Sequence, residues 1–147
     1  MTLDAELVTR KLMLVVSDLD TLRPIVEKGL NTYLESRIDQ AVVERLLERA
    51  IGRMIDVNYH IITESGQAPP TDYHASFTRL AELGVLEGSF AQRIARAAGL
   101  RNRIVHEYEA LDPARVFEGL AAAMTDIPQY ARGVNDYVAR TTGRPST

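Results

Sequence analysis

Apolar residues recur every three or four positions along most of this chain, which is the period of an amphipathic helix. The pattern predicts a first helix over residues 4–28, ending before Gly29, and a longer helix over residues 38–64. Residues 30–36 lie between them as a short linker with room for one helical turn. Pro24 is expected to kink or shorten the first helix, because proline lacks the backbone N–H that a helix interior uses.

Turn-forming residues mark the start of the second half of the chain. Residues 64–73 contain a Ser-Gly pair and a Pro-Pro pair, so they are predicted to form a loop. Thr71 or Asp72 can cap the short helix that follows over residues 73–83, and Gly84 is expected to end it.

Two longer helices are predicted after this short one. The first covers residues 90–108, with Ser89 as its N-cap. The last begins at residues 112–113, where aspartate can cap the helix and proline can take its first position without losing a hydrogen bond. Pro128 is expected to bend or break this last helix.

These elements define the expected fold class. No segment alternates polar and apolar residues over a useful length, so the sequence predicts an all-α protein. Four longer helices and one additional short helix, joined by short loops, favour an up-and-down four-helix bundle. The length of 147 residues, 46% of them hydrophobic, fits one domain over residues 1–147, with residues 141–147 as a frayed tail.

Composition excludes several kinds of site. The chain has no cysteine, so disulfides, thiolate metal ligands and cysteine nucleophiles are excluded. The first residues are charged and lack the apolar run of a signal peptide, and no stretch approaches the ~18 apolar residues of a membrane span. We therefore expect a cytoplasmic protein that does not enter the membrane and uses neither metal nor cofactor.

Charge is distributed unevenly along the chain. The formal net charge is −3, so any contact with nucleic acid must use a local patch. Residues 89–106 provide one, because they contain four arginines and no acid: Arg93, Arg96, Arg101 and Arg103. The flat, forked guanidinium group suits phosphate, so Arg96 and Arg103 are candidate contacts to an RNA backbone.

The segment "RNRIVHEY", residues 101–108, contains the candidate chemistry. On a helix, Asn102 and His106 are four residues apart and can meet, and Arg101 and Tyr108 share a face. Arg101 and His106, however, lie about 140° apart at ~100° per residue. Three explanations are open: Arg101 bends round, the helix ends near His106, or a second subunit completes the site.

These residue types suit cleavage of RNA without a metal. His106 can take a proton from the 2′-hydroxyl that attacks the adjacent phosphate, and Arg101 can stabilise the charge that develops on phosphorus. Asn102 can orient His106 or donate to a phosphate oxygen, and Tyr108 can stack on a base or hydrogen-bond the backbone. The alternative is a histidine favoured only by the dipole at a helix C-terminus.

"RNRIVHEY" followed by "LDPARVF" resembles the HepT-like family of HEPN-domain proteins. The family pattern is Arg-Asn-x-x-Val-His-x-Tyr, a few residues before Asp-Pro. Similarity extends upstream through "VVERLLERAIGRMIDVNYHII" and "PPTDYHASFTRLAELGVL", so it covers roughly residues 38–120. In relatives a glutamate often precedes the phenylalanine of the short helix, whereas Ala75 and Ser76 stand before Phe77 here.

The resemblance implies a HEPN homodimer that acts as a toxin ribonuclease. The Arg-x4-His segments of two subunits would line one cleft at the dimer interface, with Arg101, His106 and Asn102 as catalytic residues. Asp56 would line the same cleft. The resemblance also implies a partner antitoxin, the MntA-type nucleotidyltransferase, which transfers AMP from ATP to Tyr108 and so blocks RNA.

Two other functions are consistent with the same residues. The protein can be a non-catalytic HEPN module that binds nucleotide or RNA together with a nucleotidyltransferase partner. It can also be a plain structural dimer without a ligand, although the four-arginine segment counts against this.

Overall fold

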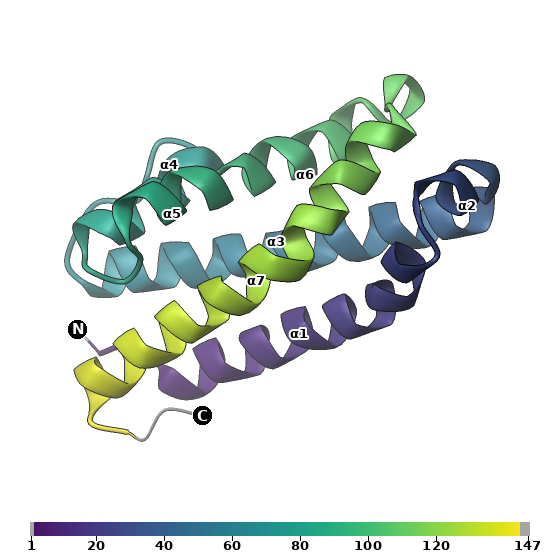
Figure 1. The fold of residues 1–147 in the computed structure, drawn as a ribbon. Coiled ribbons are helices and arrows are strands. Elements are labelled where there is room, and N and C mark those ends of the chain that lie inside the picture. Colours follow the sequence, from purple (N-terminus) through teal and green to yellow (C-terminus); the bar gives the residue numbers. More distant parts are fainter. Residues whose placement is uncertain (1, 145–147) are drawn as a thin grey trace.

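The computed structural model describes residues 2–144, and within them the chain is helical with no β-strand. Four long legs run alternately up and down, and the third leg along the chain is made of two helices in series (Figure 1). The elements are α1 (Ala5–Glu27), α2 (Leu30–Glu35), α3 (Arg37–Glu64), α4 (Tyr73–Glu82), α5 (Gly88–Ile94), α6 (Arg96–His106), the 3₁₀ turn η1 (Tyr108–Ala110) and α7 (Pro113–Thr142). The predicted all-α bundle with an additional short helix is confirmed.

Side-chain caps fix where several helices begin. Asp72 caps α4, its carboxylate accepting from the Ala75 N–H at 2.7 Å, so Asp72 rather than Thr71 is the cap. The prediction of Ser89 as a cap was wrong. Glu87, two residues earlier in the chain, caps α5, because its carboxylate accepts from the backbone N–H groups of the two residues after Gly88.

The predicted helix over residues 90–108 is divided at Ala95 and ends early. Ala95 has φ −59° and ψ −22°, close to 3₁₀ values, and its carbonyl accepts from the Ala98 N–H at 3.1 Å, so the chain tightens between α5 and α6. At the other end, Glu107 leaves the helix with φ −125° and ψ 30°, and Tyr108 starts η1. Tyr108 is therefore not a residue of α6.

Neither internal proline breaks its helix. Pro24 lies within α1, which continues to Glu27, so the predicted end of this helix was right and its shortening was not. Pro128 lies within α7, which runs unbroken to Thr142, contrary to a break at this proline. Ile127 and Tyr130, close to Pro128 on either side, are buried, and their packing offsets a cost of about 3 kcal/mol for an internal proline. The predicted tail begins inside this last turn of α7, and residues 145–147 lie outside the described range.

One hydrophobic core joins all four legs, and it contains two polar connections. In the first, the buried carboxylate of Asp18 on α1 accepts from Arg49 at 2.6 Å and from Arg53 at 3.1 Å, both on α3. In the second, the Tyr130 hydroxyl lies 2.5 Å from Asn58 Oδ1. The first connection links α1 to α3 by ion pairs, and the second links α7 to α3 by a hydrogen bond.

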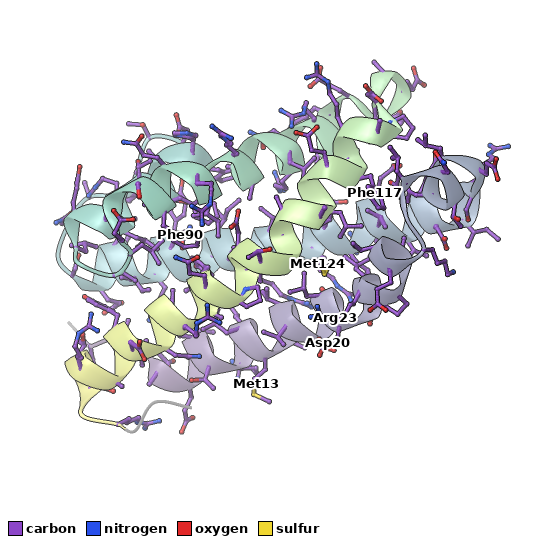
Figure 2. The ribbon with its side chains drawn as sticks, viewed as in Figure 1. Met13, Asp20, Arg23, Phe90, Phe117 and Met124 are labelled. Atoms are coloured by element: carbon purple, nitrogen blue, oxygen red, sulfur yellow. The ribbon has the colours of Figure 1, made fainter. Side chains whose placement is uncertain are left out.

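The residue 30–36 linker folds as α2, and Tyr33 anchors it. The Tyr33 ring is fully buried and lies 5.2 Å from the Phe117 ring on α7. Burial raises the pKa of the Tyr33 phenol, and the charges of two acids on α3 add to the effect. Phe117 is labelled in Figure 2, on the part of α7 that faces this end of the bundle.

The outer side of α1 faces away from the motif. Met13 points out of the bundle there, and Asp20 and Arg23 form an ion pair of 3.5 Å (Figure 2). Within the described chain α1 packs against α2, α3 and α7 but not against α6. No helix in residues 2–144 combines the length and apolar character needed to cross a membrane.

Candidate active site

The first arginine of the motif turns inward from α6. A hollow of about 560 Å³ opens between α3, α4 and α6, and we call it the Arg101 hollow. Tyr73 of α4 lines it together with Arg101, whose guanidinium lies 5.2 Å from the centre of the Tyr73 ring. The α3 side is formed by Arg49, Gly52, Arg53, Ile55, Asp56 and Tyr59.

Charges in the Arg101 hollow are paired except at Arg101. Arg49 and Arg53 donate to Asp18, and the hydrogen bond that the Asp18 carboxylate accepts raises the pKa of Arg49. Asp56 binds Lys11 of α1 at 3.2 Å. Arg101 has no carboxylate partner anywhere in residues 2–144, and its buried Nε has no acceptor. The hollow therefore holds one cation without a counter-charge.

Tyr59 lines the Arg101 hollow with a neutral phenol. Burial raises the pKa of Tyr59, and the nearby Tyr73 and Asp72 raise it further. The hydroxyl stays protonated at neutral pH, so Tyr59 offers a hydrogen-bond donor and an apolar ring rather than a charge.

The second half of the motif points to solvent. His106 is the last residue of α6 and is exposed, and Tyr108 in η1 is 67% exposed. Neither side chain contacts a polar partner within the described part of the protein. Arg101 and Tyr108 do not share a helix face as expected, because the helix stops at His106. An end of the helix near His106 was one of the three explanations offered for the angle between Arg101 and His106.

Asn102 is placed beside Arg101 rather than beside His106. Its Oδ1 accepts from Arg101 Nη1 at 3.5 Å, and it makes no hydrogen bond to His106. In a single chain, then, Arg101 and Asn102 form one half of the candidate site and His106 with Tyr108 forms another.

The two other candidate arginines belong to a different surface. Arg96 and Arg103 line a groove of about 510 Å³ between α3, α5, α6 and α7, which we call the α6–α7 groove. Arg93 lines it too, but pairs with Asp126 at 3.2 Å. Arg96 and Arg103 have no carboxylate partner among residues 2–144. The four-arginine segment is therefore split: Arg101 lines the Arg101 hollow, whereas Arg93 of α5 and two arginines of α6, Arg96 and Arg103, line the α6–α7 groove.

No three acidic or histidine side chains gather to form a metal site in residues 2–144. Asp56, expected from the resemblance to line a cleft at a dimer interface, lines the Arg101 hollow of the single chain, and its place in a dimer cleft stays a prediction.

Comparison with known proteins decides the family. The model of the HepT-like ribonuclease family matches residues 17–134. The tRNA nuclease HepT of Aphanizomenon flos-aquae is 33% identical over 132 residues, which is 90% of this chain and 90% of the nuclease. The chain belongs to the HepT-like ribonuclease family. The expected family is confirmed.

Solved structures with low sequence identity confirm the fold of this HepT-like chain. The tri-AMPylated Shewanella oneidensis HEPN toxin, solved in complex with MNT antitoxin, has a TM-score of 0.77 at 21% identity; the match covers 86% of this chain and 95% of the toxin. The cytosolic protein YutE of Bacillus subtilis, of unknown function, has a TM-score of 0.83 at 15% identity, covering 99% and 96%. The bundle is thus a HEPN fold.

Several residues of the hollow in this HepT-like protein were not foreseen from the sequence. These are Arg49, Gly52, Arg53 and Tyr59. With Asp56, which the resemblance had named, they follow the spacing i, i+3, i+4, i+7 and i+10, so the five residues form a stripe along one side of α3. The stripe is visible in the sequence, but it has the same appearance as an ordinary solvated face. Only its position opposite α4 and α6 distinguishes it.

Proposed function

We propose that this HepT-like protein is the toxin of a toxin–antitoxin pair and a metal-independent endoribonuclease. The observation that carries the proposal is that neither end of Arg-x4-His is neutralised by a carboxylate in residues 2–144. Arg101 has a guanidinium without a carboxylate, and His106 has an exposed imidazole without a hydrogen bond. Free donor and base groups of this kind are what a transesterification on RNA requires.

The proposed reaction is an attack within the RNA itself. His106 takes the proton of a 2′-hydroxyl, the 2′-oxygen bonds to the adjacent phosphorus, and the bond to the 5′-oxygen breaks. Arg101 stabilises the extra charge on the phosphate oxygens. Asn102 orients the catalytic groups or donates to a phosphate oxygen. The products are a 2′,3′-cyclic phosphate and, after protonation, a 5′-hydroxyl end.

We further propose that the working site forms between two copies. Arg101 and His106 leave α6 in different directions, so a second protomer supplies the missing half of each cleft. Arg96, Arg103 and Asp56 are proposed to contact the RNA beside that cleft. The relative named a tRNA nuclease makes tRNA the first substrate to test.

A nucleotidyltransferase antitoxin of the MntA type is the proposed partner, and AMP on Tyr108 the proposed off-switch. Tyr108 is 67% exposed and two residues from His106, so a transferase can reach its hydroxyl. A bound AMP would bring bulk and negative charge to the RNA-binding cleft. The structural relative solved as a tri-AMPylated toxin with its antitoxin supports this regulation.

The direct test is cleavage of tRNA in the presence of EDTA by purified protein. Arg101→Ala is expected to slow cleavage roughly 10²- to 10³-fold and His106→Ala roughly 10²- to 10⁴-fold. Arg10→Ala is the matched control, because Arg10 is an exposed arginine of α1, which does not contact α6.

The chemical ends of the RNA fragments distinguish an endoribonuclease from a non-catalytic RNA-binding module. A 2′,3′-cyclic phosphate formed in EDTA supports the proposed chemistry. If both site variants cleave as fast as the parent, the residue assignment is wrong. If the parent binds tRNA but yields no product after long incubation, the protein is a non-catalytic RNA-binding module.

A further inference from the structure

We propose that the Arg101 hollow is a nucleotide subsite, in which Tyr59 and Tyr73 hold one unstacked base of the RNA and Arg101 holds the adjacent phosphate. The proposal rests on the proposed ribonuclease function and adds to it the residues that position the strand. Tyr59 and Tyr73 lie outside the Arg-x4-His motif, on α3 and α4.

The two tyrosines provide an aromatic corner. Their ring centres are 6.2 Å apart and their planes meet at 81°, so the rings form two nearly perpendicular walls. Tyr73 is 39% exposed and Tyr59 is half-buried, which leaves aromatic surface open to the hollow. Proteins that read single-stranded RNA commonly pack a base on such rings, because every base has a flat apolar face.

Arg101 supplies the matching charge at the same place. Its guanidinium already lies over the Tyr73 ring at 5.2 Å, and its only hydrogen-bond partner among residues 2–144 is Asn102. The other charges of the hollow are occupied in ion pairs with Asp18 and Lys11. The phosphodiester next to the base is therefore the group that would pair with the Arg101 guanidinium and accept its hydrogen bonds.

Gly52 indicates that the hollow is kept open. It stands in the interior of α3, where glycine weakens a helix relative to alanine. No atom lies within 4 Å of a Cβ added at this position, so packing does not require a glycine. Gly52 lines the Arg101 hollow, so a side chain at this position would enter the hollow. The glycine therefore leaves space for a ligand.

Buried hydrogen bonds hold Tyr73 in position. The Ser76 hydroxyl donates to the Tyr73 carbonyl at 2.7 Å, and Asn58 Nδ2 donates to Ser76 Oγ at 3.1 Å. Asn58 is in turn fixed by Tyr130 of α7. The backbone that carries the Tyr73 ring is thus held in place, which reduces the ordering cost of binding a base.

The test uses a short synthetic RNA with 2-aminopurine as its central base, bound to protein that carries His106→Ala so that cleavage does not interfere. Stacking on a tyrosine quenches this fluorescent base. Tyr73→Leu and Gly52→Leu are each expected to weaken binding roughly 5- to 100-fold and to abolish the quenching. Tyr73→Phe keeps the ring and is expected to retain both.

The matched control for Gly52→Leu is Ala41→Leu. Ala41 is an exposed residue of α3 that lies about 20° from Gly52 around the helix and three turns away from it. Ala41→Leu is expected to bind the RNA as the His106→Ala protein does. Circular dichroism of each variant confirms that the bundle has formed.

Three results would overturn the proposal, and they are distinguishable. If the parent cleaves RNA while Tyr73→Leu and Gly52→Leu bind as tightly as the control, only the subsite is wrong. If the parent neither binds nor cleaves RNA, the ribonuclease function fails and the subsite fails with it. If the variants change the oligomeric state and leave RNA affinity intact, the hollow is a protein contact instead.

Discussion

Arg101 and His106 are five residues apart on one helix, yet they have opposite surroundings. Arg101 is half-buried against the Tyr73 ring, and His106 is exposed at the end of α6. The motif was visible in the sequence, and so was the angle between its two residues. The end of the helix near His106 was one of three open explanations, and the contact of Arg101 with Tyr73 was not foreseen, because it joins residues distant in the chain.

Tyr108 is the residue whose proposed role can be tested by mass alone. Co-expression of the protein with an MntA-type nucleotidyltransferase is expected to add AMP units of ~329 Da each to the intact protein, since Tyr108 is exposed and has no hydrogen-bond partner in residues 2–144. Tyr108→Phe removes the acceptor hydroxyl and is expected to remain unmodified. Equal AMP addition to the parent and to this variant would show that another residue is the acceptor.

At the scale of the element, the hydrophobic period determined the lengths of the helices well. The ends of α1, α3 and α4 agree with the predicted ranges within about two residues, because glycines and capping side chains mark them in the sequence. The boundary between α5 and α6 at Ala95 is marked by neither a glycine nor a capping side chain in the sequence. The surrounding alanines and arginines all favour helix, so the tightened turn reflects packing against α4 and α7 rather than local preference.

Two glycines in long helices should respond oppositely to alanine. Gly52→Ala is expected to raise the free energy of unfolding by about 0.5–1 kcal/mol, because nothing lies within 4 Å of the new Cβ and a flexible residue is removed. Gly133→Ala is expected to lower it by about 1–3 kcal/mol. Its Cβ would lie 2.9 Å from Leu86 Cδ2 and 3.1 Å from the Val85 carbonyl oxygen. Urea denaturation measures both; a shift of the two variants in the same direction would contradict this packing.

The cap of α5 should make stability depend on pH. Hydrogen bonds from the Ser89 hydroxyl, and from the backbone N–H groups of Ser89 and Phe90, lower the pKa of Glu87. A carboxylate with a lowered folded-state pKa stabilises the fold above the ordinary glutamate pKa of about 4.3, and this stabilisation is lost as the pH falls through the folded value. Glu87→Gln is therefore expected to be less stable than the parent at pH 7, with a difference that shrinks below about pH 4.

Thermal unfolding at several pH values checks this. Glu118→Gln is the control, because Glu118 is exposed on α7 and has no hydrogen bond or ion pair within the described chain. It is expected to leave stability unchanged across the range. A constant difference between Glu87→Gln and the parent from pH 7 to pH 3 would mean that the Glu87 carboxylate does not act as the charged cap.

At the scale of the whole molecule, the bundle presents the candidate chemistry in two directions. One side of α6 faces the Arg101 hollow and the opposite side faces the α6–α7 groove, while the exposed end of the helix holds His106. The sequence and the family resemblance named the candidate site residues of α6. They did not predict that Tyr59 and Tyr73 would join Arg101, since three elements separated by loops must first pack together.

The account requires two copies of the chain for one reaction, and a mixed dimer tests this most directly. Differently tagged Arg101→Ala and His106→Ala chains are co-expressed, purified through both tags and assayed on tRNA. A shared cleft predicts that the mixed dimer recovers roughly half of the parent rate, because by two-fold symmetry one of its clefts keeps Arg101 of one copy and His106 of the other. A mixed dimer as inactive as either parent variant, beside an active dimer of unaltered and His106→Ala chains, would contradict the shared site.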